Sequence, residues 1–337
     1  MQMKEATIEL HDPQMNKATK KEILLVSGIL GIACLVFYYG GIYYGQYASA
    51  WATSGVVEYT YNVWCCIQML YSVLVLCLPF LLAGLVVKKV QKREQLLPMT
   101  QPTDKFLVAF SIGLGFLALV AGNILTSLFT NGLGKFGVSI DNSEIPMPST
   151  LSGYILIVLT AVIVPAFAEE IAFRGVVLHS LRRYGDAFAI GVSSLLFACM
   201  HGNMTQMPFA FLLGVVMGTM VVHTKSLWTS IFIHIVNNTY AVVLTLLGEM
   251  CPPETTFTAL IFIDTFGVGL SLLALYWFLK WYKGREDLHL FKPGGDDKKD
   301  QATFRRQAWF YCVASIPMLL TLYVFVVDLV KSIHTGG

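Results

Sequence analysis

Three short stretches of this sequence place ionisable and amide side chains within otherwise apolar surroundings. The side chains are Glu169, Glu170, Arg174, His201, His234 and Asn238. Carboxylates and imidazoles can move protons near neutral pH, and imidazoles and amides can donate hydrogen bonds to an oxyanion. Ionisable groups are costly within a bilayer, so their presence there indicates function. These residue types therefore point to acid–base chemistry in a water-poor site.

The spacing within these stretches gives the two carboxylates different roles. On a helix, Glu170 and Arg174 are four residues apart and can form an ion pair, whereas Glu169 is turned about 100° away. Glu169 has no partner at that spacing, so it is left as the free carboxylate that can serve as a general base. His234 and Asn238 are also four residues apart and share one helix face.

The composition of the whole chain is that of a polytopic membrane protein. Of its 337 residues, 55% are hydrophobic and 13% are charged, which is too apolar for a soluble domain of this size. Apolar runs near the roughly 20 residues that span a bilayer recur along the chain. We place nine of them at residues 23–45, 63–87, 106–129, 151–167, 187–200, 207–222, 227–247, 257–279 and 307–330. Backbone groups in lipid must be satisfied within each segment. The expected fold is therefore an all-α transmembrane helix bundle of about nine spans.

The distribution of basic residues predicts how this bundle is oriented. Cytoplasmic loops of membrane proteins are enriched in Lys and Arg. With nine spans and a cytoplasmic N-terminus, 20 of the 23 basic residues fall on the cytoplasmic side. Lys135 and Lys331 fall outside, and Arg174 lies near the fourth, membrane-embedded helix. We therefore expect a cytoplasmic N-terminus.

Helix rise brings the three polar stretches to overlapping depths. If the helix of Glu169 continues to Arg183, Glu169 lies about 21 Å from the cytoplasmic interface, and the same count gives His201 a similar depth. On the same basis His234 lies about 12 Å deep and Asn238 about 18 Å deep. A single membrane histidine is more often an interhelical hydrogen-bond partner. Packing alone, however, gives three separate helices no reason to place polar side chains at one depth in the bilayer. Their similar depths therefore favour a functional site.

These observations divide the chain into four parts. We expect a cytoplasmic N-terminal segment at 1–22, N-terminal transmembrane helices at 23–150, a catalytic core at 151–248 and C-terminal transmembrane helices at 249–337, with a cytoplasmic linker near 284–306. The seven cysteines form no CxxC pair and mostly lie in apolar runs. We expect them to be packing residues rather than disulfides or metal ligands.

The three stretches resemble, in order, the EExxxR, FxxxH and HxxxN signatures of the CAAX protease and bacteriocin-processing family, whose members include the Ras-converting CAAX endoprotease. The match covers residues 169–238, with every key position intact. The resemblance implies an intramembrane glutamate endopeptidase in which Glu169 and His201 activate a water molecule. It also implies that His234 and Asn238 donate hydrogen bonds to the oxyanion, that the acid–arginine pair orients the helix segment of Glu169, and that no cofactor is needed.

Other functions remain open at this point. Glu169, His201 and His234 could hold a zinc ion, since a carboxylate and two imidazoles are a familiar zinc set, although the sequence has no HExxH pair. A non-proteolytic scaffold or a bacteriocin self-immunity protein is a second alternative. A transporter ranks last, because the sequence shows no repeat or broken-helix pair between its halves.

The expected partners follow from the membrane setting. They are a membrane-associated protein or peptide substrate and the lipid bilayer. The basic residues lie in membrane-flanking loops rather than in one patch, so no nucleic-acid partner is expected. The short loops favour a bacterial plasma membrane.

Overall fold

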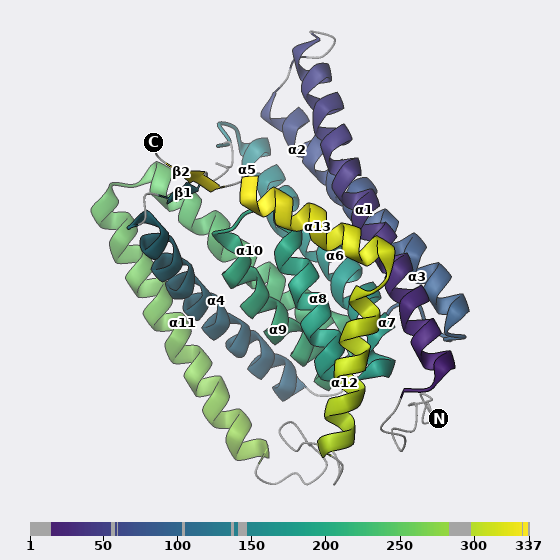
Figure 1. Cartoon of the computed structure of the whole chain (residues 1–337). Coiled ribbons are helices and arrows are strands. Elements are labelled where there is room, and N and C mark those ends of the chain that lie inside the picture. Colours follow the sequence, from purple (N-terminus) through teal and green to yellow (C-terminus); the bar gives the residue numbers. More distant parts are fainter. Residues whose placement is uncertain are drawn as a thin grey trace.

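The fold is a bundle of helices, shown as a computed structural model in Figure 1. The structure describes residues 15–54, 58, 60–102, 105–135, 138–140, 147–282, 298–331 and 333–335. Within these residues nearly every element is helical, and the two strands have three residues each. The prediction of a polytopic all-α bundle is confirmed.

The helices follow one another with short connections. The first are α1 (Lys17–Thr53), α2 (Tyr61–Leu70), η1 (Tyr71–Cys77), α3 (Leu78–Val90) and α4 (Lys105–Gly134), followed by strand β1 (Val138–Ile140). The middle elements are α5 (Leu151–Ile157), η2 (Val158–Ile163), α6 (Val164–Glu170), η3 (Ile171–Leu178), α7 (His179–Leu181), η4 (Arg182–Tyr184), α8 (Asp186–Met200), α9 (Gln206–Thr224) and α10 (Leu227–Met250). The last are α11 (Pro253–Tyr282), α12 (Lys298–Val313), α13 (Ile316–Lys331) and strand β2 (Ile333–Thr335). Segments η1, η2 and η3 are π-helical, and η4 is a 3-10 turn.

All nine apolar runs are helical, but fewer of them can cross a bilayer. In the described part of the chain, seven helical stretches are long and apolar enough, or eight if the bent pair α12 and α13 counts as one span. Helix α8 has 15 residues, and its length of about 22 Å falls short of the bilayer core. Helices α12 and α13 meet at 81°. Pro317 accounts for this break, because it lacks an N–H and its ring clashes with the carbonyl four residues earlier. The expected number of about nine spans is thus reduced.

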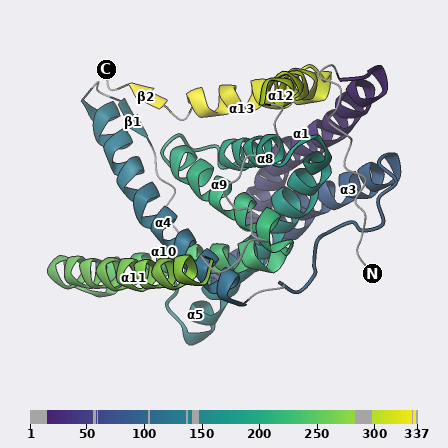
Figure 2. The same cartoon turned by 90° about the horizontal axis from the view of Figure 1, so that it is seen from below.

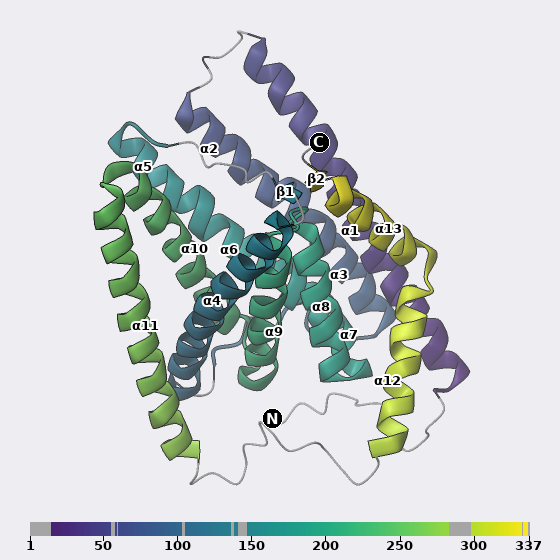
Figure 3. The same ribbon diagram turned by 60° about the vertical axis from the view of Figure 1, so that its left-hand side comes forward.

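Helices α8 and α9 form a hairpin that returns to the side on which it begins. The two helices pack along each other (Figure 3). At the open end, His223 of α9 interacts electrostatically with Asp186, the first residue of α8, and with Arg182 of η4. The orientation of α10 is therefore the same whether or not α8 crosses the bilayer. The cytoplasmic N-terminus remains a prediction. It does not depend on whether the short helix α8 crosses the bilayer.

The polar segments expected at 1–22 and 284–306 lie partly outside the described residues. The described part of the first segment already belongs to α1, which begins at Lys17 after the Asn16 side chain accepts a hydrogen bond from the Thr19 N–H. The described part of the second belongs to α12, from Lys298 onward. Both helices therefore begin before the apolar runs that predict them.

Helix α13 packs closely against α1 (Figure 1). A Cβ atom at Gly31 would lie 2.6 Å from the backbone nitrogen of Met318 and 2.7 Å from the carbonyl carbon of Pro317. The Thr321 hydroxyl donates to the Gly31 carbonyl at 2.9 Å. Beyond the other end of α13, strand β2 pairs antiparallel with β1. Helix α13 thus packs on α1 at its start, and the strand that follows α13 pairs with β1.

This close approach predicts that Gly31→Ala destabilises the protein. The added methyl group meets backbone atoms that cannot move aside, which costs about 1–3 kcal/mol, partly offset by the roughly 1 kcal/mol that alanine gains over glycine in a helix. The melting temperature of the full chain in detergent should fall by roughly 2–6 °C. Gly45→Ala is the matched control on the same helix, because no atom lies within 4 Å of its Cβ position. A Gly31→Ala variant that melts at or above the Gly45→Ala variant would contradict the prediction.

Candidate functional site

Glu170 and Arg174 form an ion pair in the interior of the bundle. The Nη1 atom of Arg174 donates to Oε1 of Glu170 at 2.8 Å, and both side chains are 0% exposed. Glu170 is the last residue of α6, and Arg174 lies in the π-helical segment η3. The contact is the one that their spacing of four residues predicts. A buried charge pair of this kind persists only with close contact geometry, so it fixes the two side chains relative to each other.

His234 of α10 contacts the same carboxylate. Its Nδ1 atom lies 2.9 Å from Glu170 Oε1, and the side chain is 4% exposed. Because this oxygen accepts from Arg174, we assign the hydrogen to Nδ1, which donates to the carboxylate. The Nε2 atom then faces Glu169. The sequence pairs His234 with Asn238 on one helix face and gives no sign of the contact with Glu170, which joins two different helices.

Glu169 is the less constrained of the two carboxylates. Its side chain is 17% exposed, and its Oε2 atom lies 3.8 Å from Nε2 of His234, beyond hydrogen-bond length. This oxygen has no hydrogen-bond partner among the described residues. The phenol of Tyr71, the first residue of η1, is near enough to interact electrostatically with Glu169. Glu169 is therefore a carboxylate with an uncommitted oxygen beside an imidazole.

The ring of Phe197 lies between the ion pair and His201. The Arg174 guanidinium carbon is 4.2 Å from the ring centroid, a distance typical of a cation–π contact. The ring of His234 is 6.0 Å away and the ring of His201 is 4.9 Å away, both nearly perpendicular to it. One aromatic side chain of α8 thus contacts groups from η3, from α10 and from the end of its own helix.

His201 is held at the end of α8 by a backbone contact. Its Nδ1 atom is 2.8 Å from the Phe197 carbonyl oxygen. A carbonyl can only accept, so Nδ1 carries the hydrogen and Nε2 is left with its lone pair in the neutral ring. The ring is partly buried, between exposed and core residues. The Nε2 atom of His201 is therefore able to take up a proton.

Asn238 lies one helical turn beyond His234 on α10. Its Oδ1 atom accepts from the Nδ2 atom of Asn237 at 3.0 Å, so its own amide nitrogen points elsewhere as a donor. Of the six candidate residues, Glu169, Glu170, Arg174 and His234 lie in mutual contact or close to it, and His201 joins them through Phe197. Asn238 shares the helix of His234 and shows no direct contact with the carboxylates.

Gly214 of α9 is a positioning residue that the sequence analysis missed. A Cβ atom here would lie 3.2 Å from Nη2 of Arg174 and 3.0 Å from Cβ of Ser194. The absent side chain gives the guanidinium its space. A glycine inside an apolar helix is the one signal in the sequence that could have marked this position. Tyr71 was missed as well, and the π-helical turn that begins there is of a kind that often accompanies functional sites.

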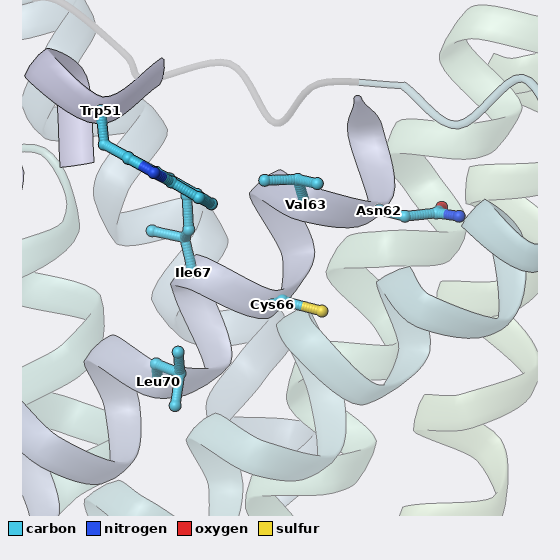
Figure 4. Close-up of a pocket in the computed structure, with 6 residues that line it drawn as sticks. All are labelled: Trp51, Asn62, Val63, Cys66, Ile67 and Leu70. Carbon is cyan, nitrogen blue, oxygen red and sulfur yellow. The ribbon is translucent and has the colours of Figure 1, made fainter. Parts of the chain in front are cut away.

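A pocket of about 270 Å³ lies away from these residues (Figure 4). It is an apolar hollow between the end of α1 and α2, lined by Trp51, Asn62, Val63, Cys66, Ile67 and Leu70. None of the six candidate residues reaches it. Separately, no three His, Cys, Asp or Glu side chains in the described ranges are grouped so as to hold a metal ion. All seven cysteines are free, and five of them are buried.

Comparison with known proteins places the site within a described family. Residues 151–240 match the Rce1-like family, described as type II CAAX prenyl endopeptidase Rce1-like. All six candidate residues lie in this range. This part of the chain is therefore similar to that family. Together with the apolar helices, the match identifies an integral, multi-pass membrane protein.

A curated protein is also similar to part of the chain. The chain is 26% identical over 144 residues to the Bacillus subtilis (strain 168) protein named "Putative membrane peptidase YdiL". The similarity covers 40% of this chain and 59% of the relative, so the chain spans about three fifths of the length of the curated relative it matches. No solved structure matches the chain.

The buried ion pair predicts a large effect of Arg174→Met on stability. Without the guanidinium, Glu170 becomes a buried carboxylate that has lost its permanent countercharge, which should cost about 3–5 kcal/mol. The double variant Glu170→Gln/Arg174→Met removes both charges and should recover part of this loss. The measurement is the melting temperature of each variant in detergent.

A second ion pair of the same spacing provides the matched control. Arg182 and Asp186 are also four residues apart and 2.9 Å apart, but they are partly exposed. Arg182→Met should therefore change the stability by no more than about 1 kcal/mol. Equal losses for Arg174→Met and Arg182→Met would show that burial of the first pair does not matter.

Proposed function

We propose that this protein is a membrane endopeptidase that cleaves peptide bonds in membrane-associated proteins or peptide precursors. The observation that most supports it is the uncommitted oxygen of Glu169 beside His234, next to a second carboxylate that Arg174 already neutralises. A general base must be free to accept a proton, and its neighbour must not compete for it. The family match and the name of the relative agree with a peptidase.

In the proposed reaction, Glu169 and His201 activate a water molecule. Either the Glu169 carboxylate or the Nε2 atom of His201 takes a proton from the water. At the same time the water oxygen bonds to the substrate carbonyl carbon. The carbonyl π electrons move to oxygen and form a tetrahedral oxyanion. When the C–N bond breaks, the proton held by the base passes to the leaving amine. The products are a carboxylic acid and an amine, and the site regains its starting charge.

His234 and Asn238 are the proposed donors to the oxyanion. The amide nitrogen of Asn238 remains a donor because its oxygen accepts from Asn237. The Nε2 atom of His234 can donate when the ring is an imidazolium, since the Nδ1 hydrogen faces Glu170. Two carboxylates lie within 4 Å of the ring. With one guanidinium and one imidazolium, the four-residue cluster has no net charge. One fixed donor in such a site is worth about 2.7–4 kcal/mol in the transition state.

Two further functions remain as alternatives. A scaffold or a bacteriocin self-immunity protein needs membrane helices but has no use for a free carboxylate in their interior. A transporter could use buried acids and histidines as a proton relay, but the sequence shows no paired repeat. We further propose a bacterial plasma membrane as the location, in line with the source of the relative.

Substitution of the proposed bases tests the proteolytic function. Glu169→Gln and His201→Ala should each lower cleavage by about 10²–10⁴-fold, because each removes a proton acceptor and leaves the fold intact. The measurement compares, by mass spectrometry, new peptide termini in cells with the intact protein and with each variant. His223→Gln is the matched control, a histidine at the far end of α9. Unchanged termini with Glu169→Gln at equal membrane levels would favour the scaffold.

Chelation separates the two proposed mechanisms of water activation. If Glu169 and His201 act without a metal, cleavage by the purified protein should persist after treatment with a strong chelator. The measurement is the rate of Glu169-dependent cleavage before chelation, after it, and after zinc is added back. Loss of cleavage with recovery on zinc would establish the zinc set of Glu169, His201 and His234 instead.

A further inference from the structure

Asp328 is an acidic residue beside the candidate site that lies outside the matched residues 151–240. It belongs to α13, in which Lys331 is the only other charged residue. An acidic side chain in an otherwise apolar membrane helix is costly and is a candidate for function. No motif in the sequence marks Asp328, because the motifs end at Asn238.

The contacts of Asp328 place it next to the residue that follows His201. Its Oδ1 atom accepts from the Tyr38 hydroxyl of α1 at 3.3 Å. Its Oδ2 atom lies 3.1 Å from the position that a Cβ of Gly202 would occupy. Gly202 has a left-handed φ of +60°, which favours glycine, and it ends the turn that carries His201. A carboxylate from α13 therefore packs against the backbone of the His201 turn.

The surrounding elements hold the carboxylate in this position. The 81° bend after α12 turns α13 across α1 and α8 (Figures 1 and 2). The close contact at Gly31 fixes the start of α13, and the pairing of β2 with β1 follows its end. The ring of Tyr38 also packs edge-on against Phe325 of α13, with centroids 6.1 Å apart. Helix α1 thus orients both α13 and the hydroxyl that binds Asp328.

We propose that Asp328, oriented by Tyr38, is a positioning residue that acts through His201; this rests on the proposed proteolytic function. When Nε2 of His201 takes a proton from water, the ring becomes positively charged, and a nearby carboxylate stabilises that charge. The same carboxylate packs against the turn and limits movement of the ring.

The other charged groups near His201 lie across the ring of Phe197. They are Glu169, Glu170, Arg174 and His234. Within this group, Arg174 neutralises one of the two carboxylates. Asp328 belongs to a different element, α13, and reaches the turn through Gly202, and its Tyr38 partner is neutral.

The kinetic test compares Asp328→Asn with a matched pair elsewhere in the bundle. Asp264 of α11 accepts from the Tyr240 hydroxyl at 2.9 Å and is likewise an acid on a membrane helix bound to a tyrosine. On a peptide substrate found through its Glu169 dependence, Asp328→Asn should lower kcat by about tenfold with KM within about twofold. Asp264→Asn should leave kcat unchanged, and Asp328→Glu should recover part of the loss. Equal kcat for Asp328→Asn and Asp264→Asn would overturn the proposal.

Chemical modification of His201 provides a readout that needs no substrate. Asp328 packs against the turn that carries His201 and limits movement of its ring. In the full-length Asp328→Asn variant, diethyl pyrocarbonate should modify His201 about two to three times faster than in the intact protein or Asp264→Asn, because the ring is held less firmly. The rate is followed by mass spectrometry of the peptide that contains His201. Equal rates in the two variants would also overturn the proposal. Unchanged peptide termini with Glu169→Gln would instead refute the proteolytic function, and the modification rates would still decide the role of Asp328.

Discussion

The buried pair of opposite charges at Glu170 and Arg174 constrains the whole centre of this bundle. Removing either partner leaves an uncompensated charge where water does not reach, so neighbouring side chains must accommodate both. His234 donates to the same Glu170 oxygen, Phe197 covers the guanidinium, and Gly214 leaves room for it. Segment η3 and helices α8, α9 and α10 are thereby tied to one charge pair. Glu169 takes its place beside His234 because it precedes Glu170 in the chain.

Local spacing explains which features of the site could be predicted from the sequence. The Glu170–Arg174 pair lies within one helix, so its spacing of four residues was enough. The contact between His234 and Glu170 joins two helices, and a single sequence holds no information on how those helices rotate about their axes. Asp328 offered a signal as an isolated acid in an apolar run, but no motif linked it to His201. For the fold, the apolar run 307–330 predicts one continuous helix, although Pro317 within it signals the bend between α12 and α13.

The matched region and the remaining helices contribute different things. Residues 151–240 contain the charge pair, both candidate bases and the proposed donors. The helices outside it bring polar groups toward the same level: Tyr38 from α1, Tyr71 from η1 and Asp328 from α13. The close packing at Gly31 is what allows α13 to approach. Differences among related chains in these outer helices would therefore change the surroundings of the bases without altering the bases themselves.

The hairpin of α8 and α9 bears on how the chain enters the membrane during synthesis. A segment of 15 residues is a poor substrate for the insertion machinery when presented alone. Paired with its successor, it can enter as one re-entrant unit, and every later helix keeps its orientation whichever depth the tip reaches. Proteins with this arrangement can lengthen or shorten the segment that carries His201 without inverting the segments made after it.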